Sequence, residues 1–349
     1  MFRGIRRQLF TGVWMLAMLV ITATICSGKY SGGTGDPCDP YQIATKTDLL
    51  ALAANTTDYN QCFILTADID MQGQVFTGAI IAANSGSSPS FQGTPFTGTF
   101  DGNGHKILSF TTNAADFTYV GGLFGCIYGG SVKNLGLENF SVSGLNYVGS
   151  LVGVNYGTIS DCYSTGSVSG SGGAGGLVGD NSGIISNCYS TGAVSGASYF
   201  VGGLVGYNYQ GTLTSCYATG SVSGYEYVGG LAGANYSIIT NCYSTGSVSG
   251  TYDVGGLVGY KEDSSSFNSS FWDINTSGQT TSAGGIGKTT AQMKQTSTFA
   301  NWDFIETWGI IENQTYPYLM TGPAADLNHD KKVDFADFAI FAENWLSSD

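Results

Sequence analysis

The sequence predicts an all-β fold: a right-handed parallel β-helix, or β-solenoid, with short capping helices and a small C-terminal EF-hand-like loop-helix. Two short motifs recur in alternation through residues 148–259, at a period of 26–28 residues. Glycine supplies 53 of the 349 residues, and only 11% of the residues are charged. A repeat of this length cannot bury an apolar face alone, so successive copies are expected to stack.

The two motifs predict short strands. The first reads Val-Gly-Gly-Leu-Val-Gly in its most regular copies and occupies residues 148–153, 174–179, 201–206, 228–233 and 254–259, with a weaker copy at 120–125. The second is close to Asn-Cys-Tyr-Ser-Thr-Gly-Ser-Val-Ser-Gly and occupies residues 161–170, 187–196, 215–224 and 241–250. Both are rich in β-branched and aromatic residues and are separated by glycines. Stacked strands lie about 4.8 Å apart, so each strand should pair with its equivalent one coil on.

Equivalent positions of stacked coils form columns along the solenoid axis. Cysteine behaves as a small apolar residue and suits an inner column, whose members are Cys162, Cys188, Cys216 and Cys242. The next residue points to the opposite side, with its hydroxyl in water, which gives an outer column of Tyr163, Tyr189, Tyr217 and Tyr243. Stacked amides can hydrogen-bond between coils, which predicts a column of Asn155, Asn181, Asn208 and Asn235. A linear row of thiols fits neither a tetrahedral metal site nor disulfides between stacked coils.

The chain is expected to have five parts. These are a signal peptide (1–28), an N-terminal cap with the first coils (29–118), the repeat solenoid (119–260), a terminal coil with a C-terminal cap (261–320), and a linker with a calcium motif (321–349). In the N-terminal part, residues 47–54 predict a helix with Thr47 as its N-cap, and residues 62–66 and 96–100 predict strands. In the C-terminal part, residues 276–287 read as a flexible segment and residues 290–294 as a helix.

The N-terminus reads as an export signal. Three arginines within residues 3–7 precede an apolar run at residues 13–25, which is shorter than the roughly 20 residues of a membrane-spanning helix. We expect cleavage near residues 27–28, with lipid attachment at Cys26 as the alternative. The prediction is a secreted or cell-surface protein with no transmembrane segment after cleavage.

Charge and cysteine content add two expectations. The formal net charge of −13 argues against nucleic acid and anionic membranes as partners. Export permits disulfides, and the cysteines outside the repeats, Cys38 and Cys62, are the candidate pair. Two unrelated free thiols are the alternative.

The two motifs closely resemble the GLUG repeat of bacterial surface proteins. The stretches at residues 96–107, 132–137 and 271–293 are also similar to segments that flank such repeats, so the resemblance covers roughly residues 40–320. It implies a solenoid architecture and a surface or extracellular location, as in adhesin-like proteins and accessory regions of secreted peptidases. It implies no reaction.

The C-terminal region contains a twelve-residue pattern that fits a calcium (Ca2+) loop. Calcium requires six to eight oxygen ligands on a tightly curled segment. The candidate ligands are Asp326, Asn328, Asp330, Lys332 through its carbonyl, Asp334 and Asp337. With the apolar helix expected at 338–346, the motif resembles half of a type I dockerin, which implies a cohesin-like or cell-surface protein as partner. Lys331 stands where such loops usually carry glycine, and cohesin-binding dockerins usually carry two halves.

A solenoid of this kind can serve as an enzyme, as a scaffold or as a glycan-binding surface. A β-helix lyase or glycosidase needs two carboxylates in one cleft, or carboxylates together with Lys or Arg and calcium. Residues 141–260 contain no Lys, Arg or His, and their acids fall at different repeat positions, namely Asp161, Asp180, Glu226 and Asp253. His105 reads as part of a glycine-rich turn. We therefore predict a non-catalytic scaffold for adhesion or surface display, with glycan binding by the tyrosine column as a further hypothesis.

Overall fold

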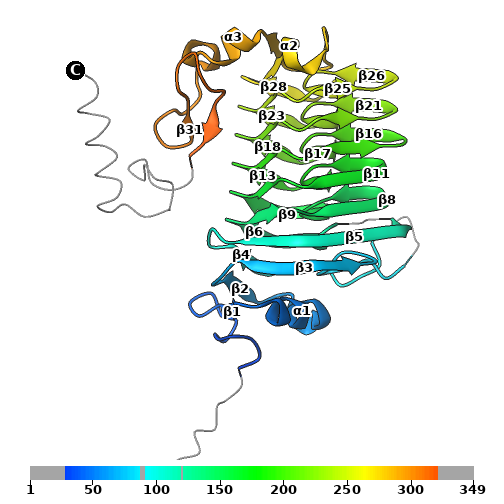
Figure 1. Ribbon diagram of the computed structural model, residues 1–349, viewed down its shortest axis with the longest axis vertical. Helices are drawn as coiled ribbons and strands as arrows, with labels where there is room; N and C mark the ends of the chain where they lie inside the picture. Colours follow the sequence, from blue (N-terminus) through cyan, green and yellow to red (C-terminus); the bar gives the residue numbers. More distant parts are fainter. Residues whose placement is uncertain (1–27, 87–90, 119–120, 321–349) are drawn as a thin grey trace, which may run out of the picture.

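The computed structural model describes residues 28–86, 91–118 and 121–320. The chain forms a parallel β-solenoid of about six turns, so the predicted fold class is confirmed (Figure 1). A helix lies at the N-terminal end of the solenoid, and a segment with short helices follows the last coil. Within these residues, every helix is too short or too polar to cross a lipid bilayer.

Two parallel sheets run along the solenoid. Within the described ranges, the first sheet contains 13 strands. Its main path is β1 (Tyr41–Ile43), β2 (Cys62–Leu65), β4 (Thr99–Asp101), β6 (Phe124–Lys133), β9 (Val152–Ser160), β12 (Val178–Asn181), β17 (Val205–Asn208), β22 (Ala232–Asn235) and β27 (Val258–Lys261). A branch beside β9 continues through β13 (Ile184–Ser186), β18 (Thr212–Thr214), β23 (Ile238–Thr240) and β28 (Ser266–Asn268).

The second sheet contains 17 strands in the same part of the chain. The early coils contribute β3 (Ile69–Phe76), β5 (Lys106–Thr118), β7 (Gly136–Glu138), β8 (Ser141–Gly149), β10 (Tyr163–Ser164) and β11 (Ser167–Gly175). The next coils contribute β14 (Tyr189–Ser190), β15 (Val194–Gly196), β16 (Tyr199–Gly202), β19 (Tyr217–Ala218), β20 (Val222–Ser223) and β21 (Glu226–Gly229). The last ones contribute β24 (Tyr243–Ser244), β25 (Val248–Ser249), β26 (Tyr252–Gly255), β29 (Phe271–Asp273) and β30 (Ile286–Lys288).

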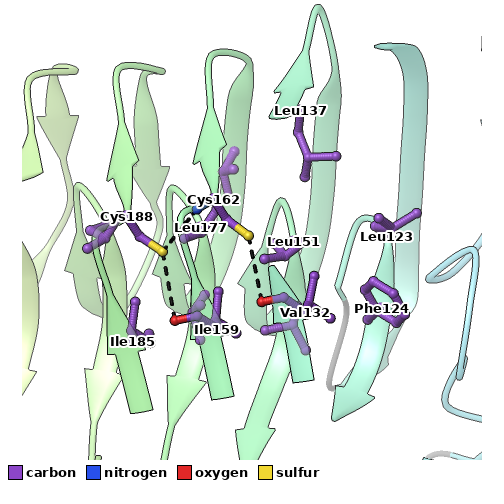
Figure 2. Close-up of a cluster of buried hydrophobic side chains, with 14 of the residues drawn as sticks. Leu123, Phe124, Val132, Leu137, Leu151, Ile159, Cys162, Leu177, Ile185 and Cys188 are labelled. Atoms are coloured by element: carbon purple, nitrogen blue, oxygen red, sulfur yellow. Dashed lines mark hydrogen bonds between the residues drawn. The ribbon is translucent and has the colours of Figure 1, made fainter. Parts of the chain in front are cut away.

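Equivalent residues of successive coils pair in register, as the repeat spacing predicts. One inner column runs through Val142, Val168, Val194, Val222 and Val248. A second comprises fully buried leucines at 123, 151, 177, 204, 231 and 257. These columns merge into one apolar core, part of which Figure 2 shows. Each such side chain contributes about 1.5–3 kcal/mol when buried, and the burial comes from the coils on either side.

The four repeat cysteines lie in this core, which confirms the inner column. The backbone N–H of Cys162 donates to Sγ of Cys188 over 3.4 Å, and the same contact joins Cys216 to Cys242. The Cys162 and Cys188 thiols also point toward carbonyls of the preceding coil (Figure 2). All four are buried free thiols. Cys38 and Cys62 are also free thiols. Of the two alternatives for this pair, a disulfide or two free thiols, the structure has the second.

The asparagine column is also confirmed. The side-chain amide of Asn155 donates to Asn181 over 2.8 Å, and that of Asn181 donates to Asn208 over 2.8 Å. Asn208 donates to Asn235 over 2.6 Å, and all four side chains are buried. Most of these amides also bond the backbone two residues ahead, so the column fixes a corner in each coil.

A second corner precedes each cysteine. Asp161, Asn187, Ser215 and Asn241 all adopt the left-handed region, with φ between 52° and 54°. Asn and Asp tolerate this conformation better than other residues that carry a Cβ. The repeated Asn at the start of the second motif therefore has a backbone role.

The N-terminal cap is the helix α1 (Lys46–Ala54), followed by the 3₁₀ turn η1 (Thr56–Asp58). The helix was predicted, but its N-cap is Thr45 and not Thr47. Thr45 accepts from the backbone of Asp48, whose carboxylate accepts in return from Thr45, so the two form a capping box. Asp48 at the third helical position decides which threonine caps the helix.

The C-terminal end differs from the flexible segment expected at 276–287. Residues of this stretch form the end of α2 (Ile274–Ser277) and the start of β30, which adds a strand beside β29. The helix predicted at 290–294 is present as α3 (Thr290–Met293). It is followed by the 3₁₀ turn η2 (Thr296–Phe299) and an antiparallel pair, β31 (Trp308–Gly309) and β32 (Tyr318–Leu319). The predicted signal peptide, but for its last residue, and the calcium motif lie outside the described residues.

Candidate functional site

The outer side of the second sheet carries the predicted tyrosine column. In one coil Tyr163, Thr165, Ser167 and Ser169 point outward, whereas Ser164 and Val168 are buried. In-register pairing repeats this pattern from coil to coil. Phenol rings and small hydroxyl side chains therefore lie side by side along the solenoid.

The tyrosine rings stack face to face. Ring centroids are 5.1 Å apart from Tyr163 to Tyr189, 4.7 Å from Tyr189 to Tyr217, and 5.0 Å from Tyr217 to Tyr243. The interplanar angles are 6°, 2° and 9°. Because each inner ring uses both faces on its neighbours, the column presents ring edges and hydroxyls. It stabilises the sheet through cross-strand contacts.

One end of the column is covered. The exposure predicted for Tyr243 is wrong: only 2% of this residue is accessible, and its hydroxyl donates to the carbonyl of Pro317 over 2.5 Å. It packs in a cluster with Phe271, Met293, Phe299, Trp302 and Trp308. Figure 1 shows this segment, in orange, folding back beside the last coils. The non-repeating C-terminal cap thus covers the Tyr243 ring, which was expected to contact water.

The other end of the column meets a polar cluster that the sequence analysis missed. The Tyr163 hydroxyl donates to Glu138 over 2.8 Å, and burial together with this carboxylate raises the pKa of the phenol. Lys106 contacts the same carboxylate at 3.0 Å. His105 Nδ1 lies 3.0 Å from the Asp68 carboxylate. Lys106 pairs with Gly136, and Gly136 pairs with Tyr163. An alignment of the early coils with the repeats would therefore have indicated the cluster.

A groove of about 270 Å³ lies next to the column on the same sheet. Serine hydroxyls and the valines between them line it, with contributions from β8, β11, β15 and β20; the serines are Ser141, Ser167, Ser169, Ser195, Ser221 and Ser223. All of these serines except Ser141 belong to the second repeat motif, and the sequence does not predict the groove. The groove provides hydroxyl donors and acceptors at the spacing of the coils.

The predicted calcium ligands, residues 326–337, are outside the described residues, so the structure does not place them. In the part of the chain it does place, no three His, Cys, Asp or Glu side chains form a group that could hold a metal ion. The two hypotheses for binding sites therefore concern different regions, the second sheet for a glycan and the C-terminal motif for calcium.

Comparison with known proteins identifies the repeats. Residues 144–169, 198–223 and 224–249 match the GLUG motif. Two curated relatives share 142-residue matches that cover 39% of this chain: Halomucin of Haloquadratum walsbyi at 37% identity, and a "Putative Gly-rich membrane protein" of Evansella cellulosilytica at 34%. These matches span 2% and 15% of the relatives' lengths.

A solved structure extends the likeness to the whole fold. It is a Bacteroides ovatus protein described as a "putative immunoglobulin A1 protease", with a TM-score of 0.66 and 25% identity. The match covers 84% of this chain and 95% of that chain. The family match confirms the predicted GLUG resemblance for three repeats. The chain is a parallel β-solenoid protein built in part from GLUG motif repeats.

Proposed function

We propose that this protein is a secreted or cell-surface, non-catalytic repeat scaffold for adhesion or surface display. The names of the two curated relatives, a mucin-like name and a membrane protein, support the location. The in-register columns carry the proposal, because hydrogen bonds between coils hold long faces in a fixed geometry. Such a face can present the same side chain to a partner several times.

Two measurements test this proposal. Antibody labelling of intact cells that express the full chain should detect the solenoid at the surface or in the medium, and retention inside the cells would contradict it. The structural neighbour's description makes immunoglobulin A1 the substrate to test. We expect the purified chain to leave immunoglobulin A1 intact over a day at 37 °C. Cleavage at one site would show that the chain is an enzyme.

We further propose that the C-terminal motif binds calcium and attaches the protein to a cohesin-like or cell-surface partner. The support is the spacing of the acidic residues between 326 and 337. Calorimetric titration of the full chain with calcium chloride should show one binding event per chain. The double variant Asp326→Ala/Asp330→Ala should lose it, since each of these residues supplies one of the oxygen ligands. Absence of a binding event in the unmodified chain would remove the attachment proposal.

The groove beside the tyrosine column favours carbohydrate binding as a second candidate function. Its serine hydroxyls and the edges of Tyr163 and Tyr189 offer hydrogen bonds along the axis, which suits an extended neutral polysaccharide. On a glycan array, the Tyr189→Ala and Ser195→Val variants should lose any signal of the unmodified chain. Tyr128→Ala serves as the control, because Tyr128 is 61% exposed and lies outside the groove. Equal loss in all three variants would contradict binding at this site.

A further inference from the structure

We propose that a different face of the solenoid binds an arginine-rich peptide segment of a partner protein. This face, the aromatic patch, is defined by Phe200, Tyr207, Tyr209, Tyr227, Tyr236 and Tyr260. Four carboxylates surround it, those of Asp180, Glu226, Asp253 and Glu262. None of these residues belongs to the tyrosine column or the serine groove, so the inference stands apart from the proposed glycan site.

The rings of the aromatic patch are in continuous contact across three coils. The Phe200 ring is 4.7 Å from Tyr207 and 5.3 Å from Tyr227. The contacts continue through Tyr236 to Tyr260, whose rings are 5.8 Å apart. Most of these rings are partly buried, and Tyr209 is 45% exposed. A contiguous and partly exposed aromatic surface is typical of a binding site.

Each carboxylate lies beside a ring. Asp180 pairs with Tyr207 of the next coil in the first sheet. Asp253 occupies the position equivalent to Tyr227, one coil further along. The Tyr260 hydroxyl contacts Glu262 at 3.5 Å. The negative charge also affects the phenols. Glu262 raises the pKa of Tyr260, and burial together with Glu226 raises the pKa of Tyr227.

Little positive charge offsets these acids. Lys261 is the one basic residue in the sequence between Lys133 and Lys288. No ion pair involving any of the four carboxylates occurs among the residues that the structure describes. The combination of aromatic rings with carboxylates that have no basic partner among the described residues is complementary to an organic cation.

Asp180 is a destabilised carboxylate beside the aromatic patch. Its Oδ1 is buried and has no hydrogen-bond partner in the described structure. A buried carboxylate oxygen without a donor destabilises the fold, and burial accordingly raises the pKa of Asp180 to about 7. A positive charge bound beside this carboxylate would favour its ionised form and reduce the cost.

Arginine fits this surface better than other cations. Its planar guanidinium stacks on aromatic faces and donates two parallel hydrogen bonds to a carboxylate, whereas the lysine ammonium is strongly hydrated and lacks the fork. Asp180 and Glu262 belong to coils three steps apart, which corresponds to about 14 Å along the axis. Four or five residues of extended peptide cover that distance.

Fluorescence anisotropy with labelled hexa-arginine and the purified full chain tests the inference. The double variant Glu226→Gln/Asp253→Asn and the single variants Asp180→Ala and Tyr209→Ala remove charge or ring surface. We expect the double variant to weaken binding at least tenfold and each single variant about threefold or more. Asp180→Ala reproduces the residue that the chain itself carries at the same column position, Ala234, so its fold should be kept. Circular dichroism checks this.

The control separates a site from general attraction to an acidic protein. Asp161→Asn removes one charge from a distant corner where other coils already carry asparagine, and it should change the affinity less than twofold. Equal loss in this control and in the patch variants would overturn the proposal, as would unchanged binding in the double variant. Hexa-lysine should bind several-fold more weakly. Equal affinity for the two peptides would overturn the assignment to arginine.

Discussion

At the scale of single residues, Asp180 differs in charge from its repeat neighbours. Equivalent positions in adjacent coils carry Val154, Tyr207 and Ala234, so the column is otherwise free of charge. The side chain is therefore placed in surroundings shaped for apolar and aromatic groups. Because the ionised form is disfavoured there, the folded protein holds a proton on Asp180 over a pH range in which the unfolded chain releases it.

This predicts that stability declines as pH rises through neutrality. The pKa of Asp180 rises from 3.8 to about 7 on folding, so its unfavourable contribution begins above pH 4 and is complete above pH 7, with an upper bound of about 4 kcal/mol. Asp180→Ala should abolish this contribution. Relative to the unmodified chain, the variant should gain about 2 kcal/mol in free energy of unfolding between pH 5 and pH 8. Urea titrations at the two pH values measure the difference.

A matched variant checks that the effect belongs to Asp180. Asp161→Asn also removes one acid from a repeat, but Asp161 is exposed at a corner. Its free energy of unfolding should follow the unmodified chain at both pH values within about 0.5 kcal/mol. If Asp180→Ala shows no pH-dependent gain in free energy of unfolding, the carboxylate is solvated. Asp180 would then give no support to the proposed binding of an arginine-rich peptide.

Much of the residue-level pattern follows from the sequence because the coils are in register. The buried position of Cys162 and the amide contact from Asn155 to Asn181 need only the repeat period and the alternation of side chains. The burial of Tyr243 does not follow from the repeat, because the segment that covers this residue is outside the repeats. The gathering of acids around the aromatic patch was also missed. Left-handed backbone at Phe200 and Tyr227 turns side chains in a way that simple alternation does not predict.

At the scale of elements, the C-terminal cap depends on one buried carboxylate. Asp273 caps α2 by accepting from the backbone of Asn275 and Thr276. It also accepts from the hydroxyls of Thr290, in α3, and Tyr316, each at 2.7 Å. A single side chain thus joins the last coil to both parts of the cap, and its charge is offset by hydrogen bonds to each.

We predict that Asp273→Ala loosens the cap while the solenoid stays folded. Four hydrogen-bonded groups lose their acceptor, which costs about 3 kcal/mol or more and leaves the aromatic cluster as the main contact between the cap and the last coils. Acrylamide should then quench tryptophan fluorescence more strongly, because Trp302 and Trp308 lie in that cluster. Glu306→Gln, at an exposed position of the same segment, is the control and should leave the quenching unchanged. Unchanged quenching in Asp273→Ala would show that ring packing alone holds the cap.

Elements outside the repeats were predicted less precisely than those within them. The cap helix was found from its composition, but Thr45 and Thr47 are both plausible caps until the partner at Asp48 is considered. Residues 276–287, which include the start of β30, are rich in Gly, Ser and Thr, a composition that predicts a flexible segment. The order of β30 comes from its pairing with β29.

At the scale of the whole molecule, stability is a sum over neighbouring coils. Each coil contacts the one before and the one after through backbone hydrogen bonds and shared apolar columns. Such an array has no single centre, and the loss of one internal unit leaves the remaining interfaces intact. The two ends behave differently, because each closes an otherwise unpaired strand edge.

Removal of one complete coil should therefore be tolerated. Deleting residues 187–214 joins Ser186 to Ser215. Ser186 precedes a corner and Ser215 occupies the equivalent corner of the next coil, so the register is kept. We expect a soluble protein with a parallel-sheet circular dichroism spectrum and a thermal midpoint lower by only a few degrees. Deleting residues 187–199, about half a coil, would place strands of one sheet against those of the other and break every column, so this control should aggregate. If both deletions fold equally well, register between coils does not hold the molecule together; if neither folds, stability is not shared among interchangeable coils.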